Sequence, residues 1–256
     1  MKKKKIAMTL ETLAFICIIW SGMAVATFVL LQFVKAPYGR HIEKGWGAEI
    51  SNRMGWIIME LPSFLIILYF AISSKQSNYA LLLSSLWLIH YFNRSIIFPF
   101  RIRTSGKKMP LVIATSAILF NMVNAGLNGY YLAKLEQYDH SNFYNLNFWI
   151  GAIVFALGFY INQRSDSILM NLRKPGETDY KIPIGFLFER ISCPNHFGEI
   201  IQWLGFSIMA WNWPASTFLI WTLANLLPRS LRHHKWYNDK FEKYPKDRKA
   251  IIPFWI

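Results

Sequence analysis

Long apolar runs constrain this chain more than any other feature. We identify seven runs long enough to cross a bilayer as helices, which takes about 20 residues. They cover residues 8–34, 54–72, 79–99, 110–131, 146–163, 197–212 and 214–228. Backbone polar groups in lipid must be hydrogen-bonded within the protein. The sequence therefore predicts an all-α, multi-pass integral membrane helical bundle with about seven transmembrane helices.

The composition excludes a soluble or disordered chain. Charged residues make up 16% of the sequence and hydrophobic residues 54%, whereas soluble domains carry about a quarter charged residues. The 256 residues fit a single membrane-embedded domain over 1–256. Cys17 and Cys193 have no metal-ligand spacing, so we predict no metal site and no disulfide between them.

The net charge of +14 is distributed unevenly about the predicted spans. Alternating the loops across seven spans places 22 of the 28 basic residues on the side of the C-terminus. The positive-inside rule then predicts a cytoplasmic C-terminus, in a bacterial inner membrane or the endoplasmic reticulum. Residues 2–5, all lysine, favour the opposite orientation. The basic face suits anionic lipid headgroups or a phosphate-rich ligand, whereas short loops between spans do not suit nucleic acid.

Carboxyl groups within the spans are candidate functional groups, because ionisable residues in a membrane are costly. Glu60 lies several residues inside a span, next to Pro62, which removes a backbone donor. A buried carboxyl group disfavours its ionised form, so Glu60 can donate a hydrogen bond, either in catalysis or to a neighbouring helix. Glu11 can reach the interface, and Glu199 can complement a helix dipole.

Two stretches carry polar residues at helical spacings: Asn162, Asp166 and Arg173 in the first, and Arg229, His233 and Tyr237 in the second. Such a stripe can hold ribose hydroxyls and phosphates, or it can be a solvated helix end. The chain has no HExxH, GxSxG, Walker or GxGxxG motif. A bound dinucleotide would therefore be held without a Rossmann unit.

Several segments, taken in order, match a known family. They are Asn-Gln-Arg-Ser-Asp at 162–166, Leu-Arg-Lys-Pro-Gly-Glu at 172–177, Asn-x-x-Gly-Glu-Ile at 195–200 and the basic, aromatic ending at 233–254. In the first half, Glu-Leu-Pro-Ser at 60–63 and His-Tyr at 90–91 also match. Across nearly its whole length the chain resembles the steroid 5α-reductase family of integral-membrane, NADPH-dependent reductases.

This resemblance implies a seven-helix bundle that takes NADPH from the cytosol and a lipid substrate from the membrane. It implies that Glu60 and Tyr91 hydrogen-bond the C3 carbonyl of a 3-oxo-Δ4 steroid or similar enone lipid. Hydride then reaches C5, and C4 is protonated. Residues 1–100 would form the substrate-side helices, with Trp56 binding substrate, and residues 101–256 the NADPH-binding part. The matched cofactor positions are Tyr38, Arg103, Asn162, Asp166, Arg173, Tyr180, Asn195, Glu199, Trp203, Arg229, His233 and Tyr237.

The chain also departs from the family pattern. Met59 stands where the residue before the acid is usually Gln, and a thioether is a weak hydrogen-bonding group. The loop at 101–108 is longer than usual, which affects the match at Arg103, and Gln202 stands where an acid is common. We therefore expect the polar support of Glu60 to differ in this chain.

Two alternatives are compatible with the residues alone. An isoprenylcysteine-type membrane methyltransferase also ends in a basic, His-containing tail, but it would use S-adenosylmethionine. A non-catalytic lipid-binding protein or transporter is the second, although the internal repeat that transporters often show is not visible. The preferred partners are membrane lipids and an enone lipid substrate, bound by a chain that can act as a monomer.

Overall fold

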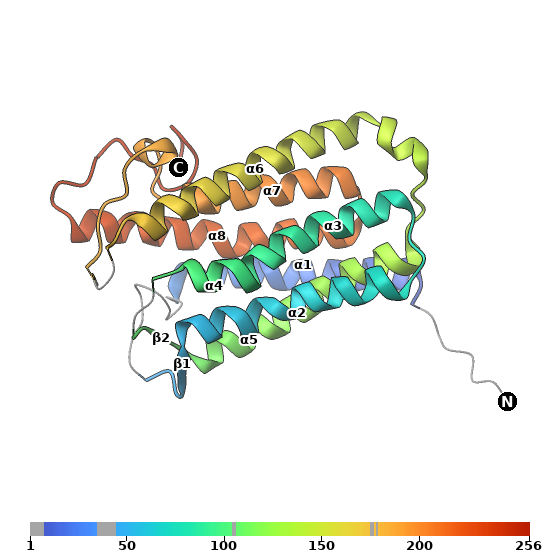
Figure 1. Ribbon diagram of the computed structural model, residues 1–256, viewed down its shortest axis with the longest axis horizontal. Coiled ribbons are helices and arrows are strands. Elements are labelled where there is room, and N and C mark those ends of the chain that lie inside the picture. The colour runs from blue at the N-terminus through green and yellow to red at the C-terminus, as the bar shows by residue number, and fades with distance from the viewer. Residues whose placement is uncertain (1–7, 35–44, 104–105, 175–176, 178) are drawn as a thin grey trace.

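The computed structural model describes residues 8–34, 45–103, 106–174, 177 and 179–256, and helices dominate this part of the chain (Figure 1). The helices are α1 Leu10–Phe33, α2 Asn52–Ser73, α3 Asn78–Phe92, α4 Phe98–Arg101, α5 Leu111–Tyr130, α6 Leu146–Asn171, α7 Pro194–Ala210 and α8 Trp213–Lys240. The long helices lie side by side in one bundle. The predicted all-α membrane bundle is confirmed.

Within the described ranges, five helical segments are long and apolar enough to cross a membrane: Leu10–Phe33, Asn52–Ser73, Asn78–Arg101, Leu111–Leu135 and Leu146–Asn171. The other two predicted spans form α7 and α8, which pack within the same bundle. Neither helix is both long and apolar enough to count as a membrane-spanning segment by itself, because α7 has 17 residues and α8 continues into a polar segment.

Two helices extend well beyond the apolar runs that predicted them. The predicted spans end at 163 and 228, whereas α6 continues to Asn171 and α8 to Lys240. Hydropathy marks where the apolar sequence ends, and the following polar residues keep the helical spacing and pack against neighbouring helices. Both extensions lie at the end of the bundle where α8 finishes, opposite the end where α1 begins (Figure 1).

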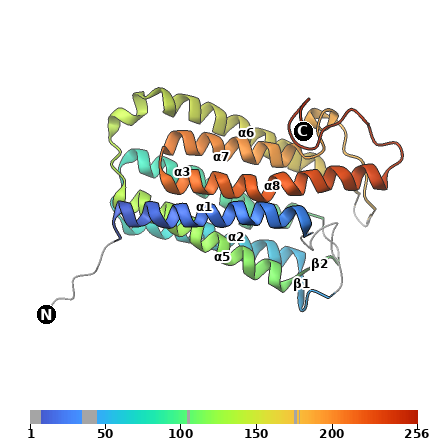
Figure 2. The same cartoon turned by 180° about the vertical axis from the view of Figure 1, so that it is seen from behind.

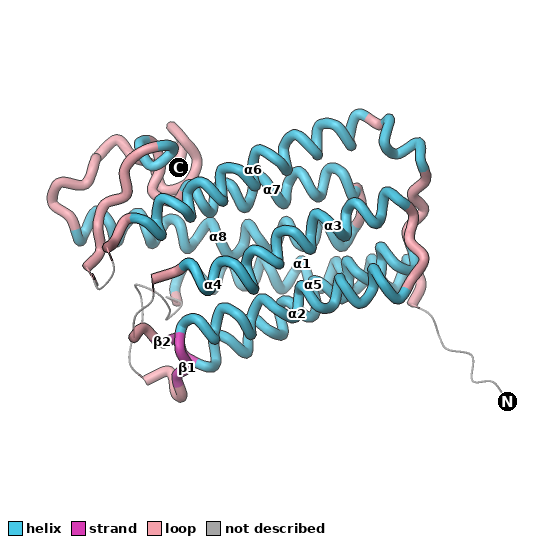
Figure 3. Tube along the Cα trace, in the orientation of Figure 1, coloured by secondary structure: helices cyan, strands magenta, loops and turns pink. Residues whose placement is uncertain are grey.

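Short irregular elements connect the helices at both ends of the bundle (Figure 3). α3 passes through a π-helical turn, Asn93–Ile97, before α4. The strands β1 Glu49–Ser51 and β2 Lys108–Pro110 pair antiparallel, with Ile50 opposite Met109. A second π-helical turn, Tyr131–Leu135, follows α5, and 3-10 turns occupy His140–Tyr144 and Phe186–Glu189.

Helices distant in sequence form the main packing pairs. α1 runs along α8, as Figure 2 shows from behind, and α2 packs along α5. Arg232 of α8 reaches α1, where its guanidinium donates to the backbone oxygens of Leu31 and Val34 at the end of that helix. The first and second halves of the chain therefore share one bundle.

Glycines bring α6 and α7 into direct backbone contact. Gly151 and Gly158 on α6 face Gly198 and Gly205 on α7, each pair spaced by seven residues. A Cβ added at any of the four would lie 2.2–2.5 Å from an atom of the other helix. Small residues let helix backbones approach closely in membranes. This contact fixes the relative position of the polar residues that follow Gly158 and precede Gly205.

Candidate active site

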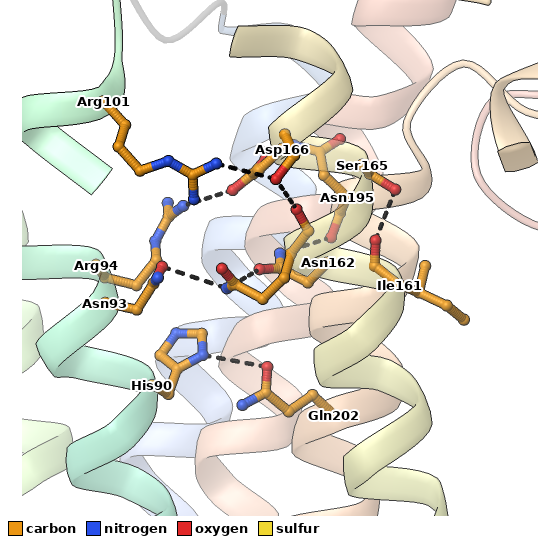
Figure 4. Close-up of polar contacts among 12 residues, drawn as sticks. His90, Asn93, Arg94, Arg101, Ile161, Asn162, Ser165, Asp166, Asn195 and Gln202 are labelled. Atoms are coloured by element: carbon orange, nitrogen blue, oxygen red, sulfur yellow. Dashed lines mark hydrogen bonds and ion pairs between the residues drawn. The ribbon is translucent and has the colours of Figure 1, made fainter. Parts of the chain in front are cut away.

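Arg94 occupies the centre of the polar site. It lies in the π-helical turn after α3, a distortion that often occurs at functional sites. Its guanidinium pairs with Asp166 of α6 at 3.3 Å (Figure 4). It also stacks 4.7 Å from the ring centroid of Trp56. Glu60 and Glu199 are also close enough to interact electrostatically with it. One half-buried cation therefore pairs with a carboxylate of α6 and lies near carboxyl groups of α2 and α7.

Glu60 and Tyr91 meet at one side chain of α5. Asn121 donates from Nδ2 to Glu60 Oε2 at 3.3 Å and accepts the Tyr91 hydroxyl at 3.3 Å. Ser63, which accepts a hydrogen bond from the Trp87 indole at 3.1 Å, also lies beside the phenol. The two predicted catalytic groups thus come from different helices and face a common point.

Next to Tyr91, two hydrogen-bond donors of α7 are buried without a partner among the described residues. They are Gln202 Nε2 and Trp203 Nε1. The Gln202 oxygen is engaged by His90 Nδ1 at 3.1 Å, and Trp203 packs beside Tyr91 with ring centroids 6.1 Å apart. Buried donors of this kind need an acceptor. A ligand carrying a carbonyl or carboxamide oxygen would supply it.

Polar residues of α6 and α7 form a hydrogen-bonded group near Arg94. Asn162 and Asp166 lie one turn apart on α6 and are both buried. The Asn162 amide donates to the Asn195 carbonyl at 3.0 Å and accepts from Gln163, which in turn donates to Asn93 at 3.2 Å (Figure 4). The expected helical stripe is therefore present for Asn162 and Asp166.

Arg173 does not continue this stripe. α6 ends at Asn171, so Arg173 lies in the following loop, where its carbonyl accepts a hydrogen bond from Arg103. Its guanidinium stacks 5.5 Å from the Tyr180 ring centroid, and Lys107 Nζ stacks on the same ring at 4.6 Å. Two basic side chains thus contact Tyr180 at the polar end of the bundle, and Arg103 contacts the backbone of one of them.

The second predicted stripe lies within α8, which contains Arg229, His233 and Tyr237. Arg229 donates to Asn225 at 3.5 Å and interacts electrostatically with Glu60. The His233 ring lies 5.6 Å from the ring of His196. Tyr237 is buried in a parallel stack on Tyr244, with ring centroids 5.2 Å apart.

The chain ending folds back beside α8 and is anchored by a polar network. The Ser192 hydroxyl lies 2.6 Å from both His234 Nδ1 and the Tyr244 hydroxyl. Ile191 pairs with Lys249 in a parallel bridge. Burial, and after it the charge of Lys249, lowers the pKa of His234. The ending thereby holds the loop that follows Tyr180 against the helix that carries Arg229.

A separate apolar pocket of about 380 Å³ opens on the flank of the bundle. Its lining comes from α2, α3, the π-helical turn and α6: Phe64, Leu88, Ile89, Phe92, Asn93, Ile97 and Phe159. Phe64 lies one turn after Glu60 on α2. An apolar, membrane-facing opening of this kind suits a lipid.

The structure assembles most of the predicted site residues at one end of the bundle, in two neighbouring groups. Tyr38 lies outside the described residues.

Sequence reasoning missed Arg94, Asn121 and Lys107 as site residues. Asn121 belongs to a set of three buried asparagines on α5, with Asn124 and Asn128. Their polarity within an apolar span was an available signal.

Known proteins match the chain over most of its length. A sequence model of the family described as 3-oxo-5-alpha-steroid 4-dehydrogenase matches residues 107–256. A steroid 5-alpha-reductase of Arabidopsis thaliana is 44% identical over 237 residues, which cover 89% of this chain and 90% of the relative. That of Gossypium hirsutum is 40% identical over 240 residues, covering 91% and 93%. The 3-oxo-5-alpha-steroid 4-dehydrogenase 1 of Homo sapiens is 38% identical over 246 residues, covering 94% and 95%.

These identities extend over both halves of the chain and include the helices that carry Glu60, Tyr91 and Asp166. They remove the methyltransferase and the non-catalytic alternatives, because the relatives are oxidoreductases. The chain is an integral membrane enzyme and belongs to the steroid 5-alpha-reductase family, the 3-oxo-5-alpha-steroid 4-dehydrogenases.

Proposed function

We propose that this protein uses NADPH to reduce the C4–C5 double bond of a 3-oxo-Δ4 steroid or a similar flat enone lipid. The observation that carries the proposal is the convergence of Glu60 and Tyr91 on Asn121. Tyr91 donates to Asn121 and Glu60 accepts from it, so both groups converge on one place within the bundle from separate helices. A protonated Glu60 and the Tyr91 hydroxyl at that place suit a carbonyl oxygen on a lipid. The apolar flank pocket beside α2 supports a lipid substrate.

Glu60 and Tyr91 polarise the enone in this proposal. With the C3 carbonyl in place, the Tyr91 hydroxyl donates to its oxygen instead of to Asn121, and the protonated Glu60 carboxyl group donates to the same oxygen. Such preorganised donors stabilise the negative charge that develops on the oxygen as an enolate forms. A proton added at C4 then completes the saturated ketone, so the product gains one hydride and one proton. Trp56, held against Arg94, is proposed to contact the substrate.

NADPH would supply the hydride to C5, and the chain offers groups suited to each part of it. The buried donors of Gln202 and Trp203 suit a nicotinamide carboxamide. Asn162, Asp166, Asn195 and Glu199 suit ribose hydroxyls, and His233 and Tyr237 are proposed to contact the same cofactor. Arginines suit phosphates because their planar forks bind two oxygens at once: Arg103, Arg173 and Arg229. Tyr38 and Tyr180 complete the proposed cofactor residues.

The proposed orientation places the C-terminus in the cytoplasm. The basic loops that dominate the charge count meet at the end of the bundle where α8 finishes (Figure 1). The phosphate-binding arginines belong to the same end, which suits a cytosolic cofactor. Within one domain over 1–256 we assign residues 1–100 mainly to the substrate and residues 101–256 mainly to NADPH, in a chain that acts as a monomer.

The test is turnover of defined enones by the purified protein in detergent. NADPH oxidation is followed by absorbance with progesterone or testosterone, and the product is identified by mass spectrometry. We expect a 5α-reduced product that retains the 3-ketone. Absence of NADPH oxidation with every member of a lipid enone panel would refute the proposal.

Variants of the two catalytic residues locate the chemistry. Glu60→Gln and Tyr91→Phe should each lower kcat by about 10²- to 10³-fold, the usual cost of one oxyanion donor, with little change in NADPH affinity. Tyr79→Phe is the matched control, because Tyr79 is also a buried phenol of α3 and donates to the Met209 carbonyl at 3.0 Å. Normal turnover in Glu60→Gln would remove Glu60 from the mechanism.

A further inference from the structure

Asn121 connects the two side chains that the proposed function makes catalytic. It is 3% exposed, and its Nδ2 donates to Glu60 Oε2 at 3.3 Å and to the Met59 backbone carbonyl at 2.6 Å. A backbone carbonyl can only accept, so Nδ2 must face α2. The amide oxygen is then directed at Tyr91, whose hydroxyl must act as the donor.

The other buried asparagines of α5 bond differently. Asn124 donates to the Phe120 carbonyl and Asn128 to the Asn124 carbonyl, each one turn back on its own helix, and Asn128 also donates to the Pro214 carbonyl of α8. Within the described part of the chain, Asn121 makes no such local bond, and its side-chain hydrogen bonds go to α2 and α3. An asparagine needed only to satisfy its own polarity could use the local bond that its neighbours use.

We propose that Asn121 is a positioning residue for the reduction, an inference that rests on the proposed function. Its amide nitrogen holds the Glu60 carboxyl group. Before substrate binds, its amide oxygen accepts the Tyr91 proton and holds that hydroxyl beside Glu60, and the substrate oxygen then replaces Asn121 as the acceptor. Met59 has a thioether and offers no comparable side-chain hydrogen bond to Glu60. In this chain the polar support of the acid therefore comes from α5.

The first test replaces Asn121 by leucine, which has a similar shape and no hydrogen-bonding group. Asn121 bonds to a phenol and a protonated carboxyl group, both neutral, and the loss of two neutral hydrogen bonds should lower kcat by about 10-fold. NADPH affinity should stay within about twofold. The deuterium isotope effect on kcat, measured with NADPH deuterated at the transferred position, should rise because hydride transfer becomes slower relative to the other steps.

The matched control is Asn124→Leu, one turn further along α5. It removes a buried amide and the hydrogen bond from the Trp20 indole at 3.2 Å, but it touches neither Glu60 nor Tyr91. We expect comparable loss of thermal stability and no change in the isotope effect. Asn121→Asp preserves the shape and the acceptor toward Tyr91 but removes the donor toward Glu60. It should also lower kcat, and the added carboxyl group should change the pH profile of kcat relative to the wild type.

The outcomes separate this inference from the proposed function. Equal kcat and equal isotope effects in Asn121→Leu and Asn124→Leu would overturn the positioning role. If Glu60→Gln and Tyr91→Phe lose turnover in the same assay, the proposed function stands while the role of Asn121 fails. A wild-type protein that oxidises no NADPH with any enone refutes the proposed function, and the positioning role with it.

Discussion

A methyl group added at Gly158 tests whether the contact between α6 and α7 sets the geometry of the cofactor site. A Cβ at this position would lie 2.2 Å from the backbone nitrogen of Gln202 and 2.6 Å from its Cα. Ordinary van der Waals contact begins at 3.4 Å, so the helices must separate by about 1.2 Å. The opposing atoms belong to the backbone, and no change of side-chain rotamer can relieve the clash.

The separation should lower the stability of the fold moderately and should lower kcat/KM for NADPH strongly. Overpacking of this kind costs about 1–3 kcal/mol of stability. Asn162 and Asp166 follow Gly158 on α6, while Asn195 and Glu199 lie on the opposing helix. A displacement of about 1 Å between groups that hold one ligand can cost about 100-fold in activity. We therefore expect Gly158→Ala to lower kcat/KM for NADPH by about that factor.

The assay combines NADPH titration with thermal unfolding, and Gly126→Ala is the control. Gly126 lies on α5 with no atom within 4 Å of an added Cβ, so alanine there should stabilise the helix by up to about 1 kcal/mol. Wild-type NADPH affinity in Gly158→Ala, together with an unfolding midpoint that rises as in Gly126→Ala, would refute the close contact and the reasoning built on it.

Three further predictions concern charged groups of the site. Arg94→Gln should lower kcat/KM by at least about 10-fold, the lower range for a lost charged hydrogen bond, while Arg94→Lys should not restore it because an ammonium lacks the planar stack on an aromatic ring. Arg173→Ala and Arg229→Ala should each raise the NADPH Kd by about 10- to 100-fold with an unchanged circular dichroism spectrum. Burial lowers the pKa of His234 in the folded protein. Its contribution to the free energy of unfolding is therefore fully present above about pH 6.5, the usual pKa of histidine, and is lost as the pH falls below that value. His234→Gln should therefore flatten the decline of the unfolding midpoint between about pH 7.5 and 5.5.

The bundle was predictable because membrane burial imposes a simple rule on sequence. Each long apolar run became a helix, and the π-helical turn after α3 changed only the path of its last residues. The ends of α6 and α8 were less predictable. Their polar residues are compatible with a loop or a helix, and contact with neighbouring helices decides between them. Asp166, for example, stays helical beside Arg94.

Some residues of the candidate site were also predictable from the sequence and others were not. Glu60 was identifiable because an ionisable residue inside a membrane span is costly, and Asp166 was identifiable from a motif. Arg94 resembled a basic residue at the end of a span, and only the π-helical turn shows that it points inward to Asp166 and Trp56. Asn121 resembled one polar residue among several. Its role depends on the register between α2 and α5, which no local pattern in one helix encodes.

The packing of the helices also changes how residues 1–100 and 101–256 relate to the proposed site. Arg94 belongs to 1–100, yet its ion pair is with Asp166 on α6, among the residues proposed for NADPH. Asn121 belongs to 101–256, yet its hydrogen bonds are to Glu60 and Tyr91, the groups proposed for the substrate. Each part thus contributes one inward-facing polar residue to the side of the site assigned to the other. Because hydride transfer requires the two ligands to be held within contact distance, a shared set of supports is a more effective arrangement than two independent ones. The proposed division at residue 100 therefore describes the order of ligands along the chain, while the site itself is a single unit held by the packing of α2 on α5 and of α6 on α7.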